Sequence, residues 1–174
     1  MMKTLIGLVP LAIGLVVFGV AVWFLLSAEM AVGRWLLAAF LVGHGLVLVM
    51  FVVPQPGAKP ATVSGVEYPF DMARSWLITG VGMDAGLVRA IGLVLVAAVV
   101  IGFALAGLAT VGVLIPAGWW AVLVVGSAVV STLVLLLFFS PGLILGLAID
   151  AVLLWVALAA NWAPAAAIVQ RGGA

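Results

Sequence analysis

The feature that most constrains this chain is a series of apolar runs, each long enough to cross a lipid bilayer. A helix needs about 20 apolar residues to span the hydrocarbon layer. The sequence contains five such runs, at residues 5–26, 35–53, 87–113, 119–139 and 143–160. We therefore predict an all-α integral membrane protein, a bundle of five transmembrane helices that forms a single transmembrane domain over residues 1–174.

The composition agrees with a membrane protein and excludes several classes of function. Hydrophobic residues make up 68% of the chain and charged residues 6%, whereas soluble domains carry about 25% charged residues. A net charge of +1 without a basic run argues against nucleic-acid binding. The absence of cysteine and the single histidine argue against a metal site, and we expect no cofactor. The expected partners are the lipid bilayer and other membrane subunits or further copies of the chain.

The longest connection, residues 54–86, holds most of the polar side chains. Its first part is rich in Pro and Gly and is expected to be irregular. In its second part, Asp71 and Arg74 are spaced to pair on one helix face, and Trp76 adds apolar cover. We predict a short helix at the membrane surface here. The alternative to a surface ion pair of Asp71 with Arg74 is a site for a substrate or a lipid headgroup.

Charge and tryptophan positions predict an orientation in the cell membrane. The apolar run after Lys3 has about 22 residues, which exceeds the 7–15 of a signal peptide, so we expect it to be a retained span. The positive-inside rule places the N-terminus and residues 54–86 in the cytoplasm and the C-terminus outside. One group of tryptophans then falls at the outer interface, where such rings are favoured: Trp23, Trp35, Trp119, Trp120 and Trp162.

Two ionisable residues fall inside predicted spans. At 1.5 Å per residue, His44 lies about 15 Å from the outer face and Asp150 about 12 Å from the inner face. In a hydrocarbon layer of about 30 Å these depths nearly coincide, and Ser127 and Ser131 fall close to the same level. We predict an intramembrane polar centre of these four residues. His44 is either a hydrogen-bonding side chain, a proton relay or a ligand to a pigment or haem; Asp150 is either a packing lock or a proton or cation site.

Small residues at four-residue spacing predict close helix contacts. Ala98, Gly102 and Ala106 form one such face on the third run. Gly142 and Gly146 precede Asp150 at the same spacing, so we expect all three to share a face that packs against another helix.

The stretch Arg34-Trp35-Leu36-Leu37-Ala38-Ala39-Phe40-Leu41-Val42-Gly43-His44-Gly45 resembles the first helix of DoxX-type small membrane proteins, a family linked to quinol oxidase subunits. The resemblance covers one predicted helix of the five. That helix is the second span here, and apolar Val47 and Leu48 stand where the family pattern would place a lysine. No function is carried over from it.

Three functions remain open. The first is a non-catalytic subunit or scaffold of a membrane complex, which suits short loops and few polar groups. The second is a small proton-coupled transporter that uses Asp150 and His44, although a hydrophilic path needs more polar lining than these spans offer. The third is a membrane enzyme built on His44 with Ser127 or Ser131, but serine in such helices is common packing glue. We expect the first, and no enzymatic activity.

Overall fold

The computed structural model describes residues 31–53, 62–63, 66–67, 69–160, 162 and 164. Apart from one short hairpin, this part of the chain is helical. It contains four helices that are long and apolar enough to cross a membrane: Val32–Phe51, Ala85–Val111, Ala117–Leu137 and Pro141–Leu158. The prediction of a helical protein with several membrane-spanning segments agrees with these helices. The predicted span at residues 5–26 lies outside the described residues.

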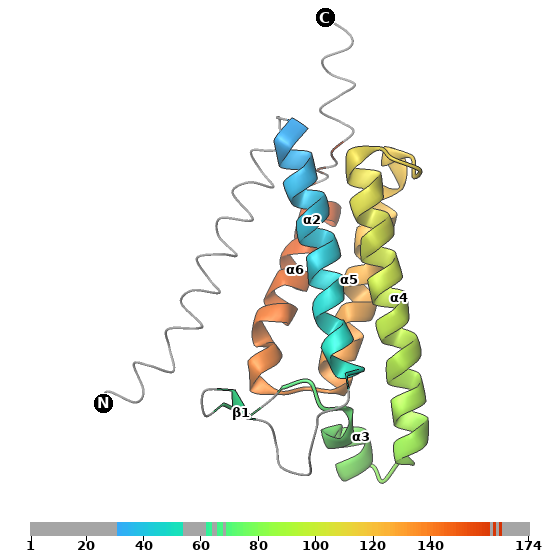
Figure 1. The fold of residues 1–174 in the computed structure, drawn as a ribbon, viewed down its shortest axis with the longest axis vertical. Helices are drawn as coiled ribbons and strands as arrows, with labels where there is room; N and C mark the ends of the chain where they lie inside the picture. Colours follow the sequence, from blue (N-terminus) through green and yellow to red (C-terminus); the bar gives the residue numbers. More distant parts are fainter. Residues whose placement is uncertain are drawn as a thin grey trace, which may run out of the picture.

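The four long helices stand side by side with alternating direction (Figure 1). Helix α2 packs mainly against α4, α4 against α5, and α5 against α6. The bounds of the helices are α2 Ala31–Val47, continued by the 3₁₀ turn η1 Leu48–Phe51, then α4 Ala85–Val111, α5 Trp120–Leu137 and α6 Ile144–Leu158. Two more 3₁₀ turns, η3 Ala117–Trp119 and η4 Pro141–Leu143, lead into α5 and α6. The helices coincide with the predicted runs to within a few residues.

Local signals set the ends of α4. The Asp84 carboxylate accepts a hydrogen bond from the Leu87 amide at 2.8 Å, which caps the helix start. Gly112 adopts the left-handed conformation at the helix end, with φ of 73°, and its N–H bonds back to the last turn. The helix therefore begins two residues before the predicted start at residue 87, because Asp84 caps it there.

The outer surface of the bundle is apolar, as a lipid-facing surface must be. Val94, Val122 and Leu158 each expose more than half of their surface, at 69%, 65% and 61%. The interior is also apolar, with Leu41, Val99, Phe103, Val124 and Leu153 almost fully buried. Because the surface is as hydrophobic as the interior, the spans have no amphipathic faces, and the described bundle suits a membrane location.

Glycines bring neighbouring helices close together. A Cβ on Gly102 of α4 would collide with the Ser127 hydroxyl of α5, and one on Gly146 of α6 would press on Leu135 of α5. Gly107 of α4 approaches the Ala38 carbonyl of α2 in the same way. Small residues thus allow close packing at each of the three helix pairs.

Three other predicted packing residues lie in different surroundings. Ala106 is buried, but Ala98 is exposed on the surface of the described bundle. Residues four positions apart are offset by about 40° around the helix axis, so three residues at this spacing do not all lie on one narrow face. Gly142 lies in η4, before α6 begins, where its neighbour is Pro69 of the connecting segment. The residue nearest to Gly142 therefore does not belong to another long helix.

The connection between α2 and α4 contains short elements. Strands β1 Thr62–Val63 and β2 Val66–Glu67 pair antiparallel, with Thr62 opposite Glu67, in a stretch predicted to be irregular. The predicted surface helix is represented by the 3₁₀ turn η2 Met72–Arg74 and the one-turn helix α3 Trp76–Thr79. The break falls at Ser75, whose hydroxyl accepts a hydrogen bond from the Leu77 amide and so caps α3. Whether these turns lie at a membrane surface remains a prediction.

Ser75 and Trp76 fasten this connection to the end of α5. The Ser75 hydroxyl donates to the Leu137 carbonyl at 2.7 Å, and the Trp76 indole N–H donates to the Leu136 carbonyl at 3.0 Å. The last carbonyls of a helix have no partner within it, so these bonds satisfy groups that would otherwise be unpaired beside an apolar environment. The connection is therefore a structural part of the bundle end.

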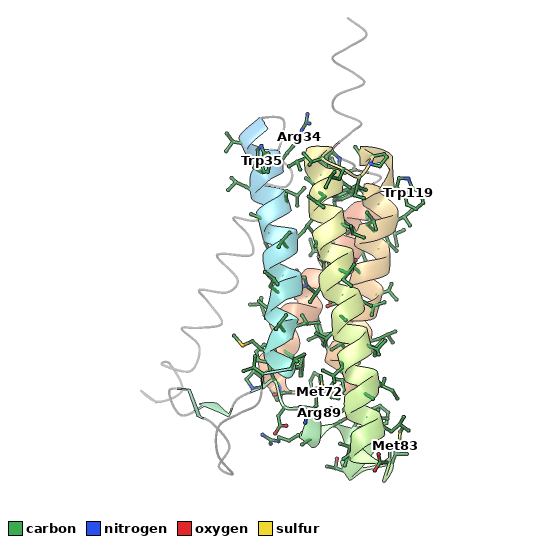
Figure 2. The ribbon with its side chains drawn as sticks, turned by 45° about the vertical axis from the view of Figure 1, so that its right-hand side comes forward. Arg34, Trp35, Met72, Met83, Arg89 and Trp119 are labelled. Atoms are coloured by element: carbon green, nitrogen blue, oxygen red, sulfur yellow. The ribbon has the colours of Figure 1, made fainter. Side chains whose placement is uncertain are left out.

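The tryptophans are distributed between the surface and the interior. Arg34, Trp35 and Trp119 lie at one end of the bundle, and Met72, Met83 and Arg89 lie at the other (Figure 2). Trp35 and Trp119 are exposed, as expected for rings at an interface. Trp120 is fully buried and meets the ring of Trp162 edge to face, with centroids 5.4 Å apart. The Trp120 ring therefore packs inside the bundle, and its position at the level of the membrane interface stays a prediction.

Candidate functional site

The structure brings His44 and Asp150 together inside the bundle. His44 lies in the second half of α2 and Asp150 in the middle of α6. The Nε2 atom of His44 is 2.9 Å from Oδ1 of Asp150, a hydrogen bond between side chains that are 106 residues apart in the chain. Asp150 is fully buried and His44 retains 8% of its exposure. The pair links the first and last of the four described helices.

Aromatic rings enclose the histidine. The Phe40 ring stacks on the imidazole with centroids 6.1 Å apart, and the Phe103 ring meets it edge-on at 5.1 Å. Gly45 makes room for Phe103, because a Cβ on it would lie 3.0 Å from the Phe103 Cβ. With few polar neighbours to screen it, the hydrogen bond is electrostatically stronger than it would be in water. For the same reason, leaving either partner unpaired would be costly.

The three hydroxyl groups of α5 make different contacts. Thr132 Oγ1 lies 3.5 Å from Oδ2 of Asp150, at the outer limit of a hydrogen bond. Ser127 donates instead to the Leu123 carbonyl of its own helix at 2.6 Å. Ser131 is fully buried, and its hydroxyl has no hydrogen-bond partner among the described residues.

Helix geometry explains why Thr132 approaches Asp150 and the serines do not. The face of α5 that contacts α6 includes Leu135, which packs on Gly146, and Thr132 lies one turn from Leu135 on that face. Ser127 contacts Gly102 of α4, and Ser131, one turn further, lies on the same face.

Thr132, Phe40 and Phe103 were not singled out in the sequence. Threonine and phenylalanine are ordinary in apolar helices, so composition gave no signal for them.

This arrangement restricts the chemistry available to the polar centre. The Ser127 hydroxyl is bonded to its own helix backbone, so it does not form a nucleophile–base pair with His44. Among the described residues, no group of three or more His, Cys, Asp or Glu side chains is placed to hold a metal ion. Which atom of the pair donates the hydrogen bond depends on the tautomer of His44.

Two cavities lie away from the His44–Asp150 pair, beside the connection between α2 and α4. The larger has a volume of about 380 Å³ and is lined by residues that include Phe51, Asp71 and Arg89. The smaller, of about 150 Å³, is lined by residues that include Asp71 and Arg74. Neither His44 nor Asp150 lines either cavity.

In the connection between α2 and α4, Asp71 and Trp76 make contacts that were not predicted from the sequence. Asp71 precedes η2 in an extended conformation, and its Oδ1 accepts a hydrogen bond from the Ala73 amide at 2.9 Å. The helical spacing expected to pair Asp71 with Arg74 therefore does not arise, because only Arg74 belongs to the helical turn. Trp76 exposes its ring and bonds to the end of α5.

Searches of family models, of curated proteins and of solved structures return no match to this chain.

Replacing Asp150 by leucine should destabilise the bundle, because it leaves the Nε2 of His44 without a partner in an apolar interior. We expect the free energy of unfolding to fall by about 1–3 kcal/mol. The double variant His44→Leu/Asp150→Leu should cost less than the sum of the two single variants, by about 1 kcal/mol. Detergent-induced unfolding followed by tryptophan fluorescence measures these differences. Strictly additive costs would mean that the two side chains do not interact.

Proposed function

We propose that this protein is a non-catalytic, multi-pass subunit or scaffold of a membrane protein complex, in which His44 and Asp150 lock the helices together. The observation that carries the proposal is the hydrogen bond between these side chains across α2 and α6, enclosed by Phe40 and Phe103. A transport site must exchange its ion with both sides of the membrane. A buried pair that neither described cavity reaches suits a structural role better.

The outer faces of the helices support association with other membrane proteins. They combine large apolar side chains with small ones, such as Ala98 on α4 beside the exposed Val94 and Ile101. Small residues on a lipid-facing helix permit a second helix to approach closely. Partners of this protein are accordingly other membrane subunits or further copies of the same chain.

The functional proposal is tested by proton flux in vesicles that contain the purified protein. Asp150→Asn keeps the size of the side chain and its capacity to bond His44, but it removes the ionisable group. We expect a pH gradient to decay equally slowly with the parent protein and with this variant, as reported by an entrapped pH-sensitive dye.

The alternative function, a small proton-coupled transporter, predicts the opposite result. The observation in its favour is that ionisable side chains within membrane spans, such as His44 and Asp150, often serve proton movement. Flux in the parent protein that disappears in Asp150→Asn would reject the scaffold and favour the transporter. If flux is absent, native mass measurement after gentle detergent extraction should find the chain bound to other subunits or copies, and a solitary chain would contradict the subunit proposal.

We further propose a fifth span at residues 5–26 and a cytoplasmic location for the N-terminus and residues 54–86. The support is the length of the apolar run and the distribution of lysine and arginine. The chain has no cysteine, so single cysteines can be introduced as labels without background. A cysteine at Lys59 should react with an impermeant reagent only from the cytoplasmic side, and one at Gly172 only from outside. Labelling of both from one side would contradict five spans.

A further inference from the structure

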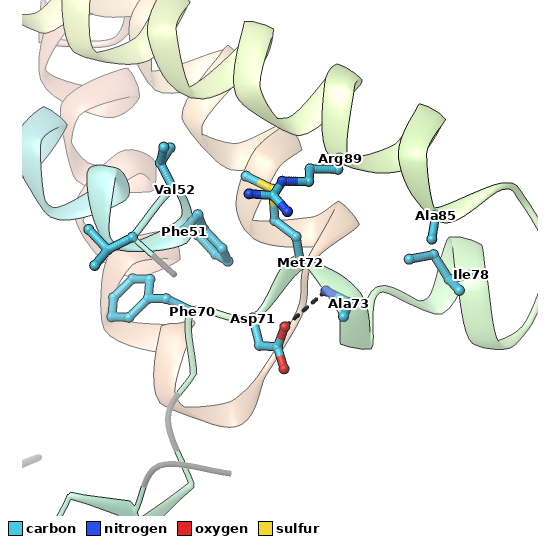
Figure 3. A pocket seen from close by; sticks show the side chains of 10 residues that line it. Phe51, Val52, Phe70, Asp71, Met72, Ala73, Ile78, Ala85 and Arg89 are labelled. Atoms are coloured by element: carbon cyan, nitrogen blue, oxygen red, sulfur yellow. Dashed lines mark hydrogen bonds between the residues drawn. The ribbon is translucent and has the colours of Figure 1, made fainter. Parts of the chain in front are cut away.

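The larger cavity lies where the chain leaves α2 and enters α4 (Figure 3). It has a volume of about 380 Å³. Its walls combine apolar side chains with one acidic and one basic group: Phe51, Val52, Phe70, Ile78, Asp71 and Arg89. A site with this composition suits an amphiphile rather than a purely apolar or a purely ionic ligand.

Arg89 provides the positive charge of the cavity. It lies in the second turn of α4, and in Figure 3 its side chain extends from that helix toward Met72. Within the described part of the chain, no acidic side chain lies at ion-pair distance from its guanidinium. A guanidinium has five N–H donors in a planar fork that matches the oxygens of a phosphate. Arg89 is thus available to bind a phosphate group.

Asp71 provides the negative charge. Its Oδ1 accepts a hydrogen bond from the Ala73 amide, while Oδ2 has no such bond among the described residues. A carboxylate oxygen of this kind accepts hydrogen bonds from an ammonium group. The carboxylate also disfavours a ligand that carries only negative charge at this place. The two charges therefore favour a zwitterion.

The apolar wall and the position in the bundle indicate the rest of the ligand. Phe51 and Phe70 meet edge to face with centroids 5.1 Å apart, and both rings line the cavity. Phe51 is the last residue of one membrane-spanning helix, and Ala85, which also lines the cavity, is the first of the next. Ends of such helices lie at the level of lipid headgroups. An acyl chain of a membrane lipid can reach the wall from there.

We propose that this cavity binds a phospholipid with a phosphoethanolamine headgroup. Arg89 binds the phosphate, Asp71 accepts hydrogen bonds from the primary ammonium, and the lipid chain lies along Phe51 and Val52. A choline headgroup has a quaternary ammonium without N–H donors, and a glycerol headgroup has no cation for Asp71. The site therefore distinguishes headgroups. This inference does not depend on whether the protein is a subunit or a transporter.

The proposal is tested by native mass spectrometry of the full chain in detergent, with phosphatidylethanolamine, phosphatidylcholine and phosphatidylglycerol of identical acyl chains. The parent protein should retain one phosphatidylethanolamine in preference to the other two. Arg89→Gln should weaken binding of phosphatidylethanolamine by about tenfold, because it removes a charge-assisted hydrogen bond. Asp71→Asn retains an acceptor for the Ala73 amide. It should lower phosphatidylethanolamine binding to the level of phosphatidylcholine.

Two controls complete the experiment. Arg34→Gln removes one cation at the opposite end of the bundle and should leave lipid retention unchanged. Soluble phosphoethanolamine should not displace the lipid, since it lacks the chains that contact the apolar wall. Equal retention of the three lipids by the parent protein would overturn the proposal. So would an Arg89→Gln variant that binds like the parent, or full displacement by the soluble headgroup.

Discussion

The hydrogen bond between His44 and Asp150 is the interaction on which the closure of this bundle depends. Neighbouring helices in the described chain touch along their lengths, but α2 and α6 are not among the principal packing pairs. Their side chains nevertheless meet at 2.9 Å in the interior. Helices in lipid have no hydrophobic force to drive them together, so packing and polar contacts determine their arrangement. This one polar contact between the first and last of the four long helices therefore fixes how the four are arranged around one another.

The remaining contacts are of a different physical kind. At the three neighbouring helix pairs, glycines such as Gly102 and Gly146 bring the helices close enough for dispersion forces to hold them. At one end, Ser75 and Trp76 satisfy the final carbonyls of α5 and attach the connecting segment to the bundle. That attachment also positions Asp71 opposite α4. The amphiphilic cavity is therefore a consequence of how the bundle end is capped.

The sequence predicted that His44 and Asp150 lie close together, and it did not identify the hydroxyl group nearest to Asp150. The 1.5 Å rise of a helix was sufficient to place His44 and Asp150 at one level. The identity of the hydroxyl nearest to Asp150 depends on how α5 is rotated, and a rotation of 100° exchanges Ser131 for Thr132. Uniformly apolar spans carry no amphipathic signal from which that rotation could be read. The exposure of Ala98 and the burial of Trp120 were unpredictable for the same reason.

The connection between α2 and α4 was predicted in its character but not in its contacts. The short helical elements of its second part follow from capping by Asp71 and Ser75. The Pro- and Gly-rich first part was predicted to be irregular, and its described residues form a short hairpin. The bonds from Ser75 and Trp76 to α5 span 62 and 60 residues of sequence. Such contacts arise only when the long helices have assembled, so local patterns contain no information on them. Asp71 likewise acts as a cap because the backbone turns at that residue.

The most direct test of the central role of His44 and Asp150 is a distance measurement between α2 and α6. Val32, near the start of α2, and Leu158, the last residue of α6, are both exposed. The start of α2 and the end of α6 lie at the same end of the bundle (Figure 1). Spin labels on cysteines at these two positions report the separation of the two helices by double electron–electron resonance. The account predicts one narrow distance distribution with Asp150 present. It predicts a broader and longer distribution in Asp150→Leu, because the partner of His44 is removed. An unchanged distribution in that variant would show that the helices are held by other contacts.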